Sequence, residues 1–212
     1  MEYIKVPHQI EEQSMQIIDE ILPHLAQLPE GEANVIRRVV HTTGDPEFAQ
    51  LVKISSEAIF SGIDALKAGC SVITDVNMVK VGINSRNLSK LGGQVDCFIS
   101  HPEVIARAKA SGSTRAIESV NYALDKLDGA IIAVGNAPTA LFRICELVRA
   151  GTIRPALIVG TPVGFVGAKE SKEFLVETPV PYITVTGSKG GSTIAAAVVN
   201  ALLYTINNDR AI

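Results

Sequence analysis

Short apolar runs recur at even spacing through the second two-thirds of the chain. The candidate strands are Ser71–Val76, Val95–Ser100, Ala130–Gly135, Ala156–Gly160 and Tyr182–Gly187. Runs such as AIIAVG and ALIVG show no alternation of apolar and polar residues. Continuous runs of this kind are typical of parallel strands that are buried on both faces. The pattern therefore favours a covered sheet over one with a solvated face.

Segments with helical periodicity lie between these strands. They are Pro102–Ser111 with Ser113–Leu127, then Pro138–Ala150, Gly167–Glu177 and Gly190–Ile206. Strands that alternate with helices are what the crossover connections of a parallel sheet require. The sequence thus predicts a doubly wound α/β fold, with a mostly parallel sheet and helices on both faces.

The first 69 residues predict a helical region without a confident strand. The helical periodicity covers Ile10–Leu28, Glu32–Thr43 and Ser56–Ala68. We expect Pro23 and Pro29 to interrupt the first helical region, because proline lacks the amide donor. Ser56 is the expected N-cap of the third helix, and Gly69 is expected in the left-handed conformation after it. No linker-like stretch or repeat appears, so residues 1–212 are expected to form a single domain.

Composition narrows the class of protein further. The hydrophobic fraction of 47 % exceeds what a small core needs, and a subunit interface is one use for the surplus. A net charge of −3 argues against nucleic acid or an anionic membrane as the main partner. Three widely spaced cysteines indicate free thiols in a reducing compartment. With no leader-like start and no membrane-spanning apolar run, the sequence predicts a cytoplasmic protein.

Glycine-rich segments follow the last three predicted strands. They are Gly135-Asn136-Ala137-Pro138-Thr139, Gly160-Thr161-Pro162-Val163-Gly164-Phe165-Val166-Gly167 and Gly187-Ser188-Lys189-Gly190-Gly191-Ser192. In doubly wound folds, ligands bind outside the carboxyl ends of the strands. Backbone amides at the starts of helices can face an anionic group there, and glycine lets that group come close. Tight turning explains one such loop equally well, but three in succession favour a binding edge.

The sequence gives little support to a nucleotide site or to a metal site. No G-x-G-x-x-G or G-x-x-x-x-G-K-[ST] pattern occurs, so nucleotide binding stays only the second interpretation. His8, His24, His41 and His101 show no i, i+4 pairing, and the cysteines form no C-x-x-C. The sequence therefore predicts no metal site.

His41 is the histidine with the best case for a chemical role. It lies in the last turn of Glu32–Thr43, just before Gly44, where the helix dipole favours the imidazolium form. Arg38 stands three residues earlier on nearly the same face. A cation and a proton donor would then project together beside an apolar stripe. A surface arginine with a histidine at the helix C-terminus is the structural alternative, and the pattern alone slightly favours it.

The sequence contains several ordered blocks that recur together in one known family. They are Ile10-Glu11-Glu12-Gln13-Ser14, Arg38-Val39-Val40-His41, Ala65-Leu66-Lys67-Ala68-Gly69, Gly112-Ser113-Thr114-Arg115, Gly135-Asn136-Ala137-Pro138-Thr139-Ala140-Leu141, Pro162-Val163-Gly164-Phe165-Val166-Gly167-Ala168 with Glu170-Ser171-Lys172, and Gly190-Gly191-Ser192. In these blocks the chain resembles the precorrin-8X methylmutases of cobalamin biosynthesis. Together the blocks span essentially the whole chain. Blocks of this length and order are far more specific than any single motif.

The resemblance implies an isomerase that moves a methyl group from C-11 to C-12 of a corrin-type polycarboxylate tetrapyrrole. It implies a homodimer with active sites near the subunit interface, and no organic or metal cofactor of the enzyme. The residue matching His41 would protonate, or hydrogen-bond to, a ring nitrogen, and those matching Ser14 and Arg38 would bind substrate. Near neutral pH, a histidine suits such a general acid.

The substrate's carboxylate arms need further donors, which local groups could supply despite the acidic overall charge. The remaining candidates for substrate binding are Arg115, Gly135, Asn136, Gly164, Lys189 and Gly190. Val163, Phe165 and Val166 could floor a wide cleft for the flat ring. The segment His41-Thr42-Thr43 resembles the members that use the cobalt-loaded substrate, which favours the cobalt form. A non-catalytic corrinoid carrier and a nucleotide-dependent oxidoreductase are the rival functions.

Overall fold

The structure is a computed structural model that describes residues 4–207, and it confirms all five predicted strands. They are β2 (Val72–Thr74), β3 (Val95–Cys97), β4 (Ile131–Val134), β5 (Leu157–Gly160) and β6 (Tyr182–Val185). These strands pair in parallel in the order β6-β5-β4-β2-β3. The strand order reverses between β2 and β4, which makes their carboxyl ends the switch point of the sheet.

A sixth strand, β1 (Val52–Ile54), pairs antiparallel with β6 at the edge of the sheet. The prediction that the first 69 residues hold no strand is therefore wrong. The sequence Val-Lys-Ile has an exposed lysine at its centre and forms no apolar run, and this segment becomes a strand by pairing with distant residues, Val52 opposite Val185.

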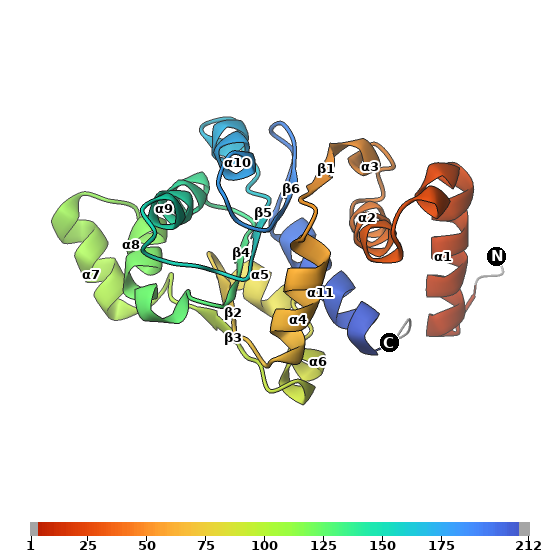
Figure 1. The fold of residues 1–212 in the computed structure, drawn as a ribbon, viewed down its shortest axis with the longest axis horizontal. Helices are drawn as coiled ribbons and strands as arrows, with labels where there is room; N and C mark the ends of the chain where they lie inside the picture. The colour runs from red at the N-terminus through yellow and green to blue at the C-terminus, as the bar shows by residue number, and fades with distance from the viewer. Residues whose placement is uncertain (1–3, 208–212) are drawn as a thin grey trace.

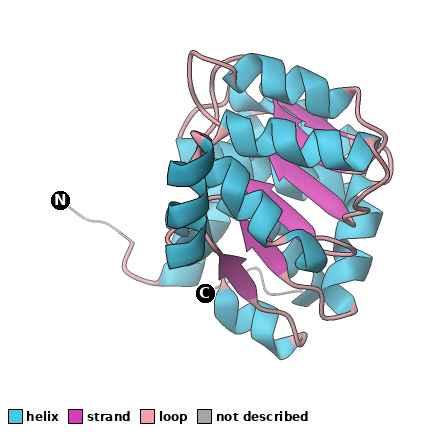
Figure 2. Cartoon of the chain, turned by 90° about the vertical axis from the view of Figure 1, so that its left-hand side faces the viewer, coloured by secondary structure: helices cyan, strands magenta, loops and turns pink. Residues whose placement is uncertain are grey.

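Helices cover both faces of the sheet, as predicted (Figures 1 and 2). Along β4 the side chains alternate between two buried clusters, with Ile131 and Ala133 in one and Ile132 and Val134 in the other. This division follows from the strand period of two, since neighbouring side chains point to opposite faces. All four positions are buried, which accounts for the continuous apolar run in the sequence.

The first cluster is formed with α1 (Pro7–Ile21), the short 3-10 helix η1 (Pro23–Gln27), α2 (Glu30–Thr43), α3 (Phe48–Leu51), α4 (Ala58–Lys67), α5 (Asn77–Gly82), α6 (Ser85–Lys90) and α11 (Ser192–Asn207). The second is formed with α8 (Arg115–Tyr122), η2 (Leu124–Lys126), α9 (Pro138–Arg149) and α10 (Ala168–Val176), while α7 (Pro102–Ser111) packs on α8. Figure 1 shows α1 at the outer edge of the molecule, beside α2.

The helix-boundary predictions for the N-terminal region are largely confirmed. Pro23 begins η1 after α1 has ended, and Pro29 is the N-cap of α2. Gly69 adopts the left-handed conformation, with φ of 78°. Ser56 is not the N-cap of α4, because Glu57 holds that place without a side-chain bond. The amide of Ala58 is satisfied instead by the carbonyl of Ser55, so no hydroxyl cap is needed there.

The end of α2 lies at the carboxyl edge of the sheet. Gly44, with φ of 65°, terminates the helix, and its amide bonds to the carbonyl of Val40. Because β1 runs antiparallel to β6, its first residue lies beside the end of β6. The amide of Thr186 also bonds to the carbonyl of Leu51 at 2.9 Å. This connection places the turn after α2 close to the loop that follows β6.

Candidate functional site

At the switch point of the sheet, a buried carboxylate occupies the loop after β4. Asp75 follows β2, and its oxygens accept the backbone amides of Gly135, Asn136 and Ala137 at 3.0, 2.8 and 2.7 Å. Burial raises the pKa of Asp75, and these amide bonds partly counter that effect. The amides that the sequence analysis expected to face an anionic ligand thus already face an anionic side chain.

Gly135 and Asn136 differ in what they can offer a ligand. A side chain at Gly135 would collide with Ser192 and Val79, so glycine permits close packing of β4 against the start of α11. Asn136 is exposed beside it. Between Gly135 and Ala137, Asn136 therefore offers the exposed side chain, while Pro138 and Thr139 beyond it are half-buried.

The loops after β5 and β6 are bound to each other. The amide of Gly191 bonds to the carbonyl of Thr161 at 2.8 Å, and that of Gly164 bonds to the carbonyl of Ser188 at 3.1 Å. A Cβ at Gly190 would collide with the carbonyls of Thr161 and Pro162, so only glycine fits this approach. The two predicted glycines, Gly164 and Gly190, therefore shape one joint surface at the carboxyl edge.

A buried lysine contacts the backbone of the loop after β6. Lys172 in α10 is 2 % exposed, and its Nζ donates to the carbonyl of Lys189 at 2.7 Å. Burial lowers the pKa of Lys172 to about 8. Among the described residues this carbonyl is the only recorded acceptor for its ammonium group. The charge of Lys172 thus has no carboxylate partner there.

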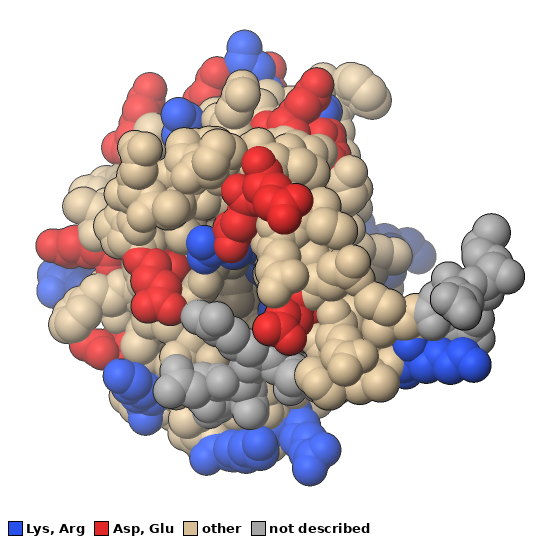
Figure 3. Space-filling model, turned by 90° about the vertical axis from the view of Figure 1, so that its right-hand side faces the viewer, with Lys and Arg blue, Asp and Glu red and all other residues tan. Residues whose placement is uncertain are grey.

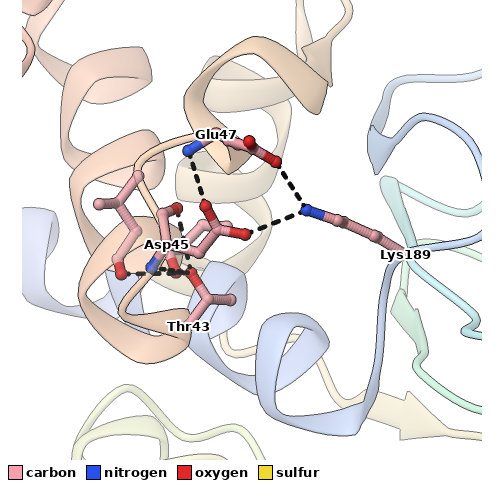
Figure 4. A network of polar contacts seen from close by, with 6 residues as sticks. Thr43, Asp45, Glu47 and Lys189 are labelled. Atoms are coloured by element: carbon pink, nitrogen blue, oxygen red, sulfur yellow. Dashed lines mark hydrogen bonds and ion pairs between the residues drawn. The ribbon is translucent and has the colours of Figure 1, made fainter.

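Lys189 itself reaches the turn after α2 (Figure 4). Its Nζ lies 3.1 Å from Asp45 Oδ2 and 3.0 Å from Glu47 Oε2. These bonds raise the pKa of Lys189, while its ammonium lowers the pKa of Asp45. Asp45 also accepts the amide of Glu47 at 2.9 Å, so the turn is internally braced. The predicted carboxylate anchor is therefore already ion-paired.

His41 and Arg38 lie on α2 as predicted, but their surroundings differ. His41 occupies the last turn and is exposed. The guanidinium of Arg38 is largely buried, lies 2.5 Å from Glu11 Oε1 and stacks over the Tyr204 ring at 4.8 Å. Ser14, on α1, donates its hydroxyl to the carbonyl of Ile10 at 2.7 Å. The arginine is thus held in place by a carboxylate of the chain itself.

A cleft of about 490 Å³ opens between α1, α2, α4 and α11. It is lined by Glu11, Met15, Asp19, Glu30, Gly31, Asn34, Arg37, Arg38, Ile59, Ile63, Ala201, Tyr204 and Thr205. Two ion pairs cross from α1 to α2 at this place, Arg38 with Glu11 and Arg37 with Asp19. Figure 3 shows basic side chains recessed in a hollow that acidic ones border. Arg38 is the one predicted site residue in this lining.

The predicted binding residues fall into two groups. Ser14, Arg38 and His41 belong to α1 and α2, and apart from Arg115 the others lie on the loops after the strands. Arg115 is exposed at the start of α8, where Thr114 caps the helix and contacts Thr139 at 3.2 Å. Val163, Phe165 and Val166 do not line the cleft, and Phe165 is 96 % exposed. The turn of Asp45 and Glu47 joins the two groups through Lys189.

Sequence reasoning missed Asp75, Lys172 and Glu11 as parts of this arrangement. The signal for Lys172 was present, because Ala168, Ser171, Lys172 and Leu175 mark the buried face of α10 at helical spacing. A lysine on such a face needs a polar partner. Asp75 directly follows a strand, which marks it equally. Glu11 shows no such signal, since its partner is 27 residues away.

The strand order, the switch point and the joined strand-end loops define a doubly wound α/β protein whose ligand edge carries fixed charges. Sequence comparison then identifies the family within this class of fold. The sequence profile of precorrin-8X methylmutase matches residues 9–205, and the chain belongs to that family. It is thereby placed among the methyl-shifting isomerases of cobalamin biosynthesis.

Individual relatives agree with this assignment over nearly their full length. The cobalt-precorrin-8 methylmutase of Leptospira interrogans is 48 % identical over 92 % of this chain and 91 % of its own. That of Salmonella typhimurium is 41 % identical over 96 % of this chain and 98 % of its own. The solved precorrin-8X methylmutase of Thermus thermophilus superposes with a TM-score of 0.85 at 40 % identity, covering 94 % of this chain and 98 % of that one.

Proposed function

We propose that the protein converts cobalt-precorrin-8 to its methyl-shifted product, moving the methyl group from C-11 to C-12 of the ring. The family match over residues 9–205 carries this proposal. The cobalt form is favoured because the Leptospira and Salmonella relatives bear that substrate in their names. The metal then arrives within the substrate, and no resident cofactor takes part.

In this proposal His41 is the acid. It lies in the last turn of α2 and is exposed, so its imidazole is open to a ligand. Donation of that proton, or a hydrogen bond, to a ring nitrogen would draw electrons from the conjugated system and ease migration of the methyl group. The shift is intramolecular, so the proton returns and no other reactant is consumed.

Arg38 and Ser14 would bind the periphery of the substrate. The guanidinium of Arg38 is already oriented by Glu11 and Tyr204, so it is preorganised for a planar carboxylate. A substrate arm would take the place of Glu11. Arg115, Asn136 and the surface around Gly164 and Gly190 would contact other arms at the carboxyl edge.

The cleft is too small for the whole substrate. Its volume of about 490 Å³ falls within the roughly 300–1,000 Å³ that holds drug-sized ligands, and a corrin with its acid arms is larger than those. The ring must therefore extend beyond the cleft. This supports a homodimer in which a second subunit completes the enclosure.

The described part of the chain contains no helix long and apolar enough to cross a membrane. Cys70, Cys97 and Cys145 are all free thiols. A protein that keeps three thiols unpaired fits a reducing compartment, and we propose that this one is cytoplasmic.

Replacement of His41 tests the mechanism. With cobalt-precorrin-8 as substrate, His41→Ala should lower kcat by at least about 10²-fold, because general acid catalysis contributes that much. Product affinity, measured by calorimetry, should change only a few-fold, since the proton matters most in the transition state. His24→Ala, an exposed histidine of η1, is the matched control. Undiminished turnover in His41→Ala would remove His41 from the mechanism.

The same assay separates the rival functions. A corrinoid carrier would bind the product but show no spectral conversion of either the cobalt-loaded or the metal-free substrate. A nucleotide-dependent enzyme would gain thermal stability from NAD(P) or ATP rather than from corrinoids. Asp75 weighs against a nucleotide-dependent enzyme, since its carboxylate already accepts the amides at the switch point that a phosphate would otherwise bind.

A further inference from the structure

A continuous polar path runs from α10 to the end of the helix that carries His41. It begins at the ammonium of Lys172, which donates to the carbonyl of Lys189 at 2.7 Å. It continues along the side chain of Lys189 to Asp45 and Glu47, at 3.1 and 3.0 Å. Asp45 lies one residue beyond Gly44, where α2 ends. The noncovalent links of this path join charged or polar atoms directly, and its other steps are covalent.

The position of the Lys189 backbone decides whether its side chain can reach these carboxylates. The adjoining residues are already confined, because Gly190 is pressed against Thr161 and Pro162, and Ser188 accepts the amide of Gly164. The carbonyl of Lys189 is fixed by Lys172 alone among the described residues. Lys172 therefore fixes a backbone group of Lys189 itself, next to the positions that the neighbouring loop already holds.

Packing alone does not account for a lysine at this place. The position is 2 % exposed on the apolar face of α10, where methionine or leucine would fill similar space without the cost of burying a charge. Burial also lowers the pKa of Lys172, which shows that the ammonium is poorly compensated. A costly group that serves a single carbonyl indicates a use for that carbonyl.

We propose that Lys172 is a positioning residue, whose buried ammonium fixes the Lys189 backbone so that Lys189 holds the 43–47 turn and, through it, the end of α2 that carries His41. The inference rests on the proposed role of His41. Lys189 then connects two parts of the site, and its ammonium is neutralised by Asp45 and Glu47 and does not serve to bind substrate.

A double-mutant cycle on turnover tests this path. Lys172→Met should lower kcat by about tenfold with KM changed less than threefold, a coupling of the size that neighbouring residues show. Lys189→Met should lower kcat to a similar degree. In the Lys189→Met background, Lys172→Met should have no further effect on kcat, because the path is already broken. Lys172→Arg, which retains donors, should recover part of the loss.

Lys169→Met is the matched control, because Lys169 lies on the same helix but is exposed and paired only with Glu173. It should leave kcat unchanged. All assays are run well below the unfolding temperature of each variant. If Lys172→Met does not fold, Lys172→Gln takes its place in the cycle.

Independent effects of the two lysines on kcat, or normal turnover in Lys172→Met, would overturn the proposal. The proposed function fails separately, because its failure appears as no spectral conversion of cobalt-precorrin-8 by the wild type. The proposed role of His41 fails as normal turnover in His41→Ala, whatever the lysine variants do.

Discussion

Arg38 shows how a single residue can be prepared for an anionic ligand within an acidic protein. Its guanidinium is paired with Glu11, and its face rests on Tyr204. Both partners restrict the side chain before any ligand arrives, which reduces the entropy lost on binding. If Arg38 binds the substrate as proposed, a substrate carboxylate must compete with Glu11 for the guanidinium.

Removal of that competitor should strengthen binding. We expect Glu11→Gln to tighten corrinoid product affinity by about fivefold, since a neutral amide holds a guanidinium more weakly than a carboxylate does. Calorimetry on wild type and variant measures this, with Glu12→Gln, an exposed neighbour, as the control. Weaker binding in Glu11→Gln would instead show that the charge of Glu11 is needed to orient Arg38.

The lowered pKa of Lys172 makes a second prediction at this scale. Between about pH 8, its folded value, and its ordinary value of 10.5, the unfolded chain holds a proton on Lys172 that the folded chain has lost. Stability from this group therefore rises with pH across that window. Buried thiols act oppositely, because burial raises the pKa of Cys70 and Cys145 to about 11.

Comparison with Lys172→Met isolates the lysine from the thiols. The free energy of unfolding of wild type minus that of Lys172→Met, measured by urea denaturation, should increase from pH 8 to pH 10.5. Lys169→Met should show no such trend. A difference that stays flat or falls with pH would mean that the amine is well solvated or well paired.

At the scale of elements, the sequence predicted what periodicity can display. The five parallel strands lie in apolar runs of the sequence, and the helices that cover them are long enough to show a helical period. β1 is as short as β2 and β3, but exposed Lys53 at its centre interrupts any apolar run. α5 and α6 have six residues each, which is too few to show a helical period clearly. These elements are fixed by tertiary pairing, which no local pattern records.

Some parts of the candidate site could likewise be predicted from local sequence patterns, and others could not. His41, Arg38 and the strand-end loops were predictable because they follow from helix ends and strand ends. The ion pair of Lys189 with Asp45 was not, since 144 residues separate the two in sequence. Contacts of this range depend on the assembled topology, and they decide which charges are free to meet a ligand.

The loop after β4 depends on Asp75, and this gives a prediction for an element. In Asp75→Asn the side-chain oxygen can still accept from Asn136 and Ala137, but the amide NH₂ would face the amide of Gly135. An unsatisfied buried donor costs about 1–3 kcal/mol, so the variant should lose that much stability. Thermal unfolding measures it, with exposed Asp125→Asn as the control. An equal melting temperature would show that the loop keeps its shape without the charge.

At the scale of the whole molecule, exposed apolar side chains support the proposed dimer. Ile10, Ile17 and Ile21 lie along one side of α1 and are about half exposed. Phe165 and Val166 project from the loop after β5, at 96 % and 90 % exposure. Patches of this kind are typical of interfaces, because water is a poor solvent for them.

Light scattering should therefore give about twice 22.5 kDa at micromolar concentration. Phe165→Ser combined with Ile17→Ser should shift the protein toward the monomer and lower turnover, since in the proposed dimer a second subunit completes the enclosure. Ile105→Ser, on the distant helix α7, should do neither. A wild-type monomer with full activity would exclude the dimer and its role in the site.

The antiparallel edge strand has a consequence for the order of folding. Val52 is synthesised long before its partner Val185. The covering helix α2 likewise packs on α11, which is made far later than α2. Contacts between such distant segments form late, after the local units have folded. The helix end that carries His41 should therefore be assembled only after α11 has been made, so that a nascent chain without α11 should not yet be active.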